Sequence, residues 1–179
     1  MSNTKTLNAI PVGETFKIGE FTFIKFADEN GVTTAVSKNH LYRSRFGNSN
    51  DFSKSDILAK LGADVLPKIE SIVGAENVVE FETDLLSLDG SAKHGVLRSK
   101  ISLPTFDFYR QNRAIFEKHK VDGWWWLSTP DSTSEYNTED WCVCVSPSGI
   151  IYGNNDCYDY GGVRPFLRFV SSISVSYDE

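Results

Sequence analysis

Three cysteines near the C-terminal end are the side chains of this sequence best able to do chemistry. Cys142 and Cys144 are two residues apart, so a β-strand would point both sulfurs to one face, and Cys157 follows a predicted turn. Three converging thiolates could hold a soft metal ion. However, the sequence has no pair of Cys-x-x-Cys motifs, and a buried free cysteine commonly serves as a small apolar side chain. We therefore expect no bound metal, and the sequence leaves open whether the three sulfurs converge.

Other residue types that could act in catalysis are present, but their spacing matches no catalytic motif. The three histidines are far apart in the sequence: His40, His94 and His119. Glu135, Glu139 and Asp140 could supply a general acid and base, but the polar segment that contains them predicts a solvated loop. We expect a protein with no catalytic residues, no cofactor and no enzymatic activity.

A run rich in tyrosine and asparagine, residues 152–160, gives the clearest indication of a binding surface. Tyrosine offers a large contact area with few torsions to immobilise, while Asn, Asp and Gly supply adaptable hydrogen bonds, as in antibody paratopes. Further aromatic and acidic side chains precede this run. We expect the following residues to contact a partner: Trp125, Trp126, Glu135, Tyr136, Glu139, Trp141, Tyr152, Asn154, Asn155, Asp156, Tyr158 and Tyr160.

The run Trp124–Trp126 and Arg164 are expected to divide between the core and the surface. On a strand the middle tryptophan faces away from its two neighbours, so at least one ring is expected in the core and at least one outside. The sequence leaves open which ring is exposed. Arg164 begins a segment expected to form a central strand, where a buried guanidinium needs a partner. We expect a structural role for Arg164, with bonds to a carboxylate or to carbonyl groups.

The distribution of charge restricts the kinds of partner. The chain has 18 basic and 24 acidic residues, a net charge of −6, and residues 121–179 contain nine of the acids but two of the bases. Phosphate backbones require clustered Lys and Arg, so we expect a protein or another macromolecule, not nucleic acid, at the C-terminal lobe. Residues 1–12 lack an apolar stretch of signal-peptide length, and no window approaches a membrane span. With an odd number of cysteines, these features predict a cytoplasmic protein without a membrane partner.

Hydrophobic periodicity predicts one α+β domain over residues 13–179, preceded by a tail at 1–12. Period-2 alternation over 13–37 predicts strands joined by a hairpin turn at Asn30-Gly31. The polar residues 41–54 predict a loop.

Helical periodicity follows from Ser55 onward. It predicts two short helices, about 55–61 and 65–73, because Gly62 and Pro67 interrupt the pattern. The other expected elements are a strand at 77–81, a helix from a Thr105 cap to about Lys118, and strands within 124–127, 141–145, 150–152 and 163–175.

Several short blocks resemble a domain-of-unknown-function family of Gram-positive bacteria and their prophages. They are residues 84–90 (DLLSLDG), 102–110 (SLPTFDFYR), 123–130 (GWWWLSTP), 143–149 (VCVSPSG) and 162–166 (GVRPF). The C-terminal blocks are also remotely similar to C-type-lectin-like and formylglycine-generating-enzyme-like domains. That similarity implies a C-type-lectin-like fold: a mixed or antiparallel sheet that pairs N- and C-terminal strands, two to three helices, and a hairpin-rich C-terminal lobe that bears the ligand surface.

Two departures from these families shape the expected function. The calcium-binding signatures of sugar-binding C-type lectins are absent, and the cysteines do not fall on the copper-binding positions of formylglycine-generating enzymes. We therefore expect a non-enzymatic binding protein encoded by a phage or another mobile element. Two alternatives stay open: an anti-defence inhibitor of a bacterial nuclease such as a CRISPR effector, whose acidic lobe would imitate phosphates, and a cysteine-metal oxidase of the formylglycine-generating type.

Overall fold

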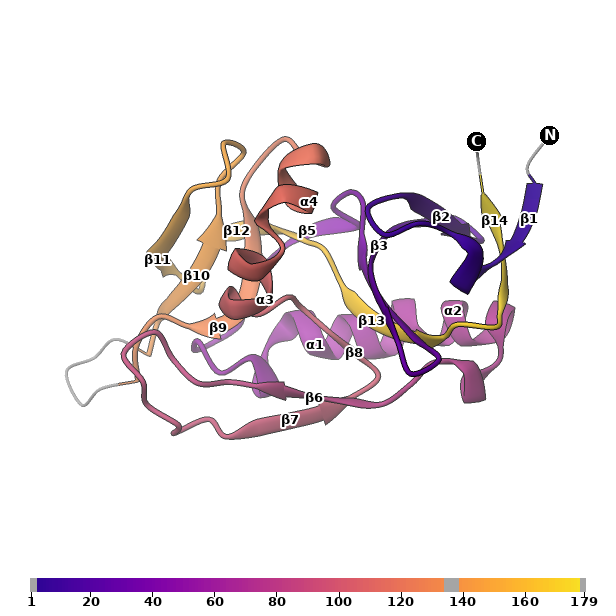
Figure 1. Ribbon diagram of the computed structural model, residues 1–179. Helices are drawn as coiled ribbons and strands as arrows, with labels where there is room; N and C mark the ends of the chain where they lie inside the picture. Colours follow the sequence, from indigo (N-terminus) through magenta and orange to yellow (C-terminus); the bar gives the residue numbers. More distant parts are fainter. Residues whose placement is uncertain (1–2, 134–138, 178–179) are drawn as a thin grey trace.

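Strands from the two ends of the chain lie side by side in one seven-stranded antiparallel sheet (Figure 1). The computed structural model describes residues 3–133 and 139–177, apart from the side chain of Asn154. From edge to edge the strands are β1 (Asn3–Thr6), β14 (Ser174–Tyr177), β2 (Thr15–Ile18), β3 (Phe21–Glu29), β4 (Val32–Ser37), β13 (Phe166–Val170) and β8 (Ile101–Ser102). The expected pairing of N- and C-terminal strands is confirmed.

Local sequence explains the central hairpin of this sheet, β3–β4. Asn30 and Gly31 have φ of 52° and 76°, the left-handed values that a two-residue hairpin turn requires. Phe23 and Ile24 are adjacent and both fully buried, so the change of parity in the sequence reflects a sheet that is covered on both faces. A register shift between Lys25 and Ala27 adds a bulge to β3.

A buried lysine near this bulge anchors the N-terminal segment. Nζ of Lys25 donates to the carbonyl oxygen of Leu7 at 2.9 Å and to Oδ2 of Asp28 at 2.7 Å. Leu7 and Ile10 are buried, and β1 pairs with β14 along its whole length. The expected tail at residues 1–12 is therefore wrong for residues 3–10, which belong to the domain.

A second, five-stranded sheet carries the C-terminal lobe. Its strands, in order, are β11 (Ile151–Asp156), β10 (Trp141–Val145), β9 (Trp125–Pro130), β12 (Tyr160–Val163) and β5 (Tyr42–Arg45). The sheet is mixed because β12 runs parallel to β9. The loop expected at 41–54 is thus partly wrong, since β5 pairs with β12. A small hairpin, β6 (Phe81–Asp84) with β7 (Val96–Ser99), replaces the strand expected at 77–81.

One helical segment runs from Asp56 to Val73, where two separate helices were expected. It consists of α1 (Asp56–Lys60), a π-turn (Leu61–Val65) and α2 (Leu66–Val73), and it ends at Gly74 with φ of 89°. The wide π-turn accommodates Pro67 in the first turn of α2, because proline has no N–H to donate there. Short 3-10 turns lie at Leu7–Ala9, Phe52–Lys54 and Ala75–Asn77.

The helix expected from Thr105 to Lys118 is broken into α3 (Phe106–Gln111) and α4 (Arg113–Lys118). The Thr105 hydroxyl accepts a hydrogen bond from the Phe108 N–H at 3.1 Å, so the expected N-cap is confirmed. Asn112 interrupts the helix, and its side-chain amide donates to the Phe108 carbonyl at 2.9 Å.

Two apolar clusters hold these layers together, and both sheets contribute to each. The first joins α1–α2 to Phe23 and Trp126, and the second joins α3–α4 to Ile24 and Trp125. Each sheet is therefore covered on both faces over much of its area (Figure 1). Over residues 3–133 and 139–177, no helix is long and apolar enough to cross a bilayer.

Candidate functional site

A groove of about 230 Å³ opens on one face of the five-stranded sheet. Side chains from β9, β10, β11 and β12 and from the adjoining turns form it. Its lining residues are Trp124, Trp126, Cys144, Asn155, Asp159, Tyr160 and Gly161. The groove therefore gathers residues from the tyrosine- and asparagine-rich run and from the tryptophan run.

Trp124 and Tyr152 form an exposed aromatic pair beside the groove. Their ring centroids are 4.7 Å apart in an edge-on arrangement, and the side chains are 37% and 42% exposed. The Gly162 N–H donates to the Trp124 carbonyl at 2.7 Å, which fixes the backbone of Trp124 against β12. Tyr160, on the other side of the groove, is 65% exposed. These rings offer apolar contact area on a rigid sheet.

Trp126 forms the buried floor of the groove. Its Nε1 donates to the Ser44 carbonyl at 2.9 Å, and its ring packs edge-on against Phe46 at 5.7 Å. A Cβ atom at Gly161 would lie 2.6 Å from Cε2 of Trp126. Glycine at position 161 is thus required by the close approach of the indole to β12.

The polar groups of the groove are an amide, a carboxylate and a buried thiol. Nδ2 of Asn155 donates to Sγ of Cys144 at 2.8 Å, which orients the amide across β10 and β11. Burial raises the pKa of the Cys144 thiol to about 12, although the hydrogen bond from Asn155 opposes this shift. The thiol therefore stays protonated at neutral pH and is a poor nucleophile.

All three cysteines lie in the first apolar cluster. Burial raises the pKa of Cys142 well above its usual value and that of Cys157 to about 11, and each thiol is free. Within the described residues no group of three or more His, Cys, Asp or Glu side chains is arranged to hold a metal ion. The environment of the sulfurs is that of apolar core side chains.

Several residues predicted to bind a partner are on the surface, but only part of them meet. Trp141, Tyr152, Tyr158 and Tyr160 are exposed, as expected. Asn155 and Tyr160 line the groove, and Tyr152 adjoins it through its ring contact with Trp124, whereas Trp141 and Tyr158 do not line it.

The acidic residues of the prediction have separate surroundings. Asp156 is exposed and accepts a hydrogen bond from the Tyr158 N–H at 2.9 Å, a local turn contact. Glu139 is paired with Lys93. Glu135, Tyr136 and the side chain of Asn154 lie outside the described residues.

The prediction that Trp125 and Trp126 contact a partner is wrong, because both are only 2% exposed. Trp125 packs on the opposite face of β9 from Trp126, with its ring 5.4 Å from that of Phe116. Alternation along the strand separated the rings correctly, but apolar clusters cover both faces at these positions. The exposed member of the run is Trp124, and the sequence analysis assigned neither Trp124 nor Asp159 to the site.

Arg164 is buried, as expected, with 1% of its surface exposed. Its Nε donates to the Ser37 carbonyl at 3.1 Å, and its guanidinium lies 4.7 Å from the centroid of Trp125. Burial lowers the pKa of the guanidinium to about 9. Arg164 was expected to bond to a carboxylate or to carbonyl groups. It bonds to the Ser37 carbonyl, and no described residue supplies a carboxylate.

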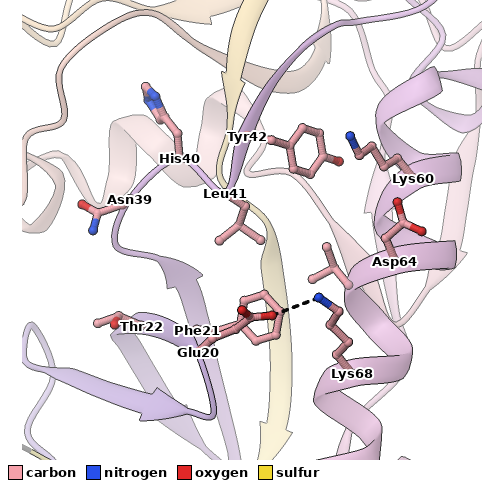
Figure 2. Close-up of a pocket in the computed structure, with 11 residues that line it drawn as sticks. Glu20, Phe21, Thr22, Asn39, His40, Leu41, Tyr42, Lys60, Asp64 and Lys68 are labelled. Atoms are coloured by element: carbon pink, nitrogen blue, oxygen red, sulfur yellow. Dashed lines mark hydrogen bonds and ion pairs between the residues drawn. The ribbon is translucent and has the colours of Figure 1, made fainter.

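A larger hollow, of about 450 Å³, lies between the helical segment α1–α2 and the loop that precedes β5 (Figure 2). Lys68 pairs with Glu20 at 3.0 Å on its rim, and Nζ of Lys60 lies 4.3 Å from the ring centroid of Tyr42. The buried Tyr42 hydroxyl has no hydrogen-bond partner among the described residues. Burial and the nearby Asp64 carboxylate raise its pKa, so it stays protonated. No residue predicted to bind a partner lines this hollow.

No protein-family model, curated protein or solved structure gives a significant match to this chain.

Proposed function

We propose that this chain is a non-enzymatic binding protein that recognises a protein partner through the face of the five-stranded sheet around the groove. We call this surface the aromatic face and define it by Trp124, Tyr152, Asn155, Asp159 and Tyr160. The observation that carries the proposal is the grouping of three exposed rings around a groove with an amide and a carboxylate.

The energetics of protein interfaces support this surface. Binding energy concentrates in a few Trp, Tyr and Arg side chains that become desolvated, surrounded by polar groups that exclude water. Trp124 and Tyr152 are already partly buried against each other, so little side-chain entropy remains to be lost when a partner covers them. Asn155 is oriented by its bond to Cys144, which further reduces the cost of ordering.

The state of the cysteines supports a function without catalysis. The thiolate is the form that attacks substrates and ligates metals, and burial disfavours it at all three positions. Free, buried thiols also suit a reducing compartment, so a cytoplasmic location is part of the proposal.

A C-type-lectin-like fold and a mobile-element origin complete the proposal. The fold is supported by the sheet that pairs β1 with β14, the helices between these strands in the sequence, and the hairpin-rich lobe formed by β9–β12. The mobile-element origin rests on the resemblance of the sequence blocks alone. In such an arrangement the lobe carries the ligand surface, where the aromatic face lies.

An anti-defence inhibitor of a nucleic-acid enzyme is the second candidate function. The exposed carboxylate of Asp159 lines the groove with the rings, and Asp156 is also exposed, in a region where acids outnumber bases. An acidic surface of this kind would occupy a site that expects phosphates, with an association rate that falls steeply as salt increases. Competition between this protein and nucleic acid for the captured partner separates the two candidates.

The test is a binding titration on a partner captured from host extract. Tyr152→Ala and Tyr160→Ala should each weaken binding by about 1–4 kcal/mol while barely changing the melting temperature. Arg110→Ala, a change at an exposed residue of α3 outside the groove, is the matched control and should bind normally. Normal binding by both tyrosine variants, together with loss of binding in Arg110→Ala, would place the functional surface on α3 and contradict the proposal.

A further inference from the structure

Arg164 carries a buried positive charge that forms no ion pair with the described residues. The described residues give its side chain one hydrogen bond, from Nε to the Ser37 carbonyl, and no ion pair. Nη2 is buried and has no hydrogen-bond partner among them. The rings of Trp125 and Phe116, at 4.7 and 5.4 Å, attract the cation but accept no conventional hydrogen bond. In folded proteins, buried charges are generally paired and hydrogen-bonded. The guanidinium of Arg164 therefore calls for a further partner.

The guanidinium lines a small hollow between α4 and the turn that joins β10 to β11. The other charged residues of its lining are Lys120 and Glu117. Nε of Arg113 pairs with Glu117 at 2.9 Å, so the negative charge of Glu117 is already matched. An excess of positive charge therefore faces the hollow, from the buried Arg164 and from Lys120.

Two other polar groups of the hollow, the Gly149 carbonyl and the Ser146 hydroxyl, already take part in hydrogen bonds. The Gly149 carbonyl accepts from the Tyr109 hydroxyl at 2.9 Å and from Nη1 of Arg113 at 3.4 Å. The Ser146 hydroxyl shares a hydrogen bond with the Ser148 hydroxyl and accepts another from the Ile150 N–H. None of the described residues therefore supplies a partner for Nη2.

The size of the hollow limits this partner to one small body. Its volume is about 10 Å³, roughly the space of a single water-sized sphere. Phosphate, sulfate and organic acids are too large for it. A water molecule would satisfy the hydrogen bond of Nη2 but would leave the charge unbalanced.

We propose that this hollow binds one monovalent anion of the size of chloride, held by Nη2 of Arg164 and attracted by Lys120. The site is separate from the aromatic face, because Trp125 lines the hollow whereas Trp126, on the opposite face of β9, lines the groove. A bound anion links the β10–β11 turn to α4 and, through Arg164, to β4 of the other sheet. The stability of the domain then depends on the chloride concentration.

The test is urea unfolding of the full chain at neutral pH and constant ionic strength, with sodium chloride replaced stepwise by sodium gluconate. Gluconate is too large for the hollow and keeps general salt effects matched. Because one anion binds the folded state alone, each tenfold rise in chloride above its dissociation constant should raise the folding equilibrium constant about tenfold. Sodium bromide should act in the same way, and its anomalous scattering in crystals should place bromide at Nη2 of Arg164.

Two variants show whether the effect arises at this site. Arg164→Met keeps most of the side-chain volume but removes the charge, so the dependence on chloride should disappear. Arg110→Met removes an exposed arginine that pairs with Asp107, and the dependence should remain. Equal chloride dependence in the wild type and Arg164→Met, or none in the wild type, would overturn the proposal in favour of a water molecule. If Arg164→Met does not fold, wild-type crystals without a bromide peak at Arg164 overturn it.

Discussion

Acidification should destabilise this protein through His40. The imidazole packs against Gly162, where an added Cβ would lie 2.5 Å from the ring, and its buried Nε2 has no partner among the described residues. Burial, with smaller contributions from the positive charges of Arg164 and Arg43, lowers the pKa of His40 from 6.5 to about 4, and Asp122 opposes the shift. The folded protein therefore holds His40 neutral under conditions where the unfolded chain is protonated.

The sign and size of the effect follow from this difference in pKa. Above pH 6.5 the ring is neutral in both states, and His40 costs no stability. As the pH falls from 6.5 to about 4, the unfolded state takes up the proton first and unfolding becomes easier. The shift corresponds to a loss of at most about 3 kcal/mol of unfolding free energy by the lower end of this range.

The assay is urea unfolding across this pH range for the wild type and for His40→Gln. Burial also lowers the pKa of His94, so the informative quantity is the difference between the two proteins at each pH. We expect the unfolding free energy of His40→Gln to rise relative to that of the wild type as the pH falls. Parallel stability curves for the two proteins would refute the reasoning, because they would mean that His40 titrates alike in the folded and unfolded states.

Three further predictions concern packing and metal content. Gly161→Ala should lower the unfolding free energy by about 1–3 kcal/mol in a thermal or urea melt, because its Cβ would lie 2.6 Å from the Trp126 ring. Unchanged stability would mean that the indole moves freely. Tyr42→Phe should leave stability unchanged or raise it by up to about 1 kcal/mol, since the hydroxyl that it removes is buried and has no partner among the described residues. A clear loss of stability would reveal a hydrogen bond to that oxygen. Metal analysis of the purified protein should find no stoichiometric metal, because the buried thiols stay protonated. For the same reason a chelator should leave the melting temperature unchanged. One equivalent of copper or zinc per chain would contradict this prediction.

Local patterns predicted the elements whose cause is local. The Asn30-Gly31 turn, the Thr105 cap and the strand segments on either side of residues 146–149 follow from backbone preferences and hydrogen bonds within a few residues. The strands β1 and β5 were missed for the opposite reason. Both are short and largely polar, and they form because a distant strand supplies an open edge. Such pairing leaves no periodic signal in the strand itself.

The candidate site was predicted in part, and its errors have one physical origin. Composition identified the exposed tyrosines at 152 and 160. Alternation correctly placed Trp125 and Trp126 on opposite faces, but it could not tell which rings meet water, because apolar clusters pack on both faces at these positions. Trp124 precedes the strand and is 37% exposed, and its exposure depends on how the layers pack, which no local pattern contains.

The position of β13 in the large sheet has a consequence for synthesis on the ribosome. This strand lies inside the sheet, between β4 and the short edge strand β8, yet it is among the last segments to be made. At about 5–20 residues per second, roughly ten seconds separate the emergence of β4 from that of its partner. During this interval β4 presents an unpaired hydrogen-bonding edge next to the apolar side chains of β3, and such edges are templates for aggregation. A nascent chain arrested before Phe166 is therefore the form of this protein in greatest need of a chaperone.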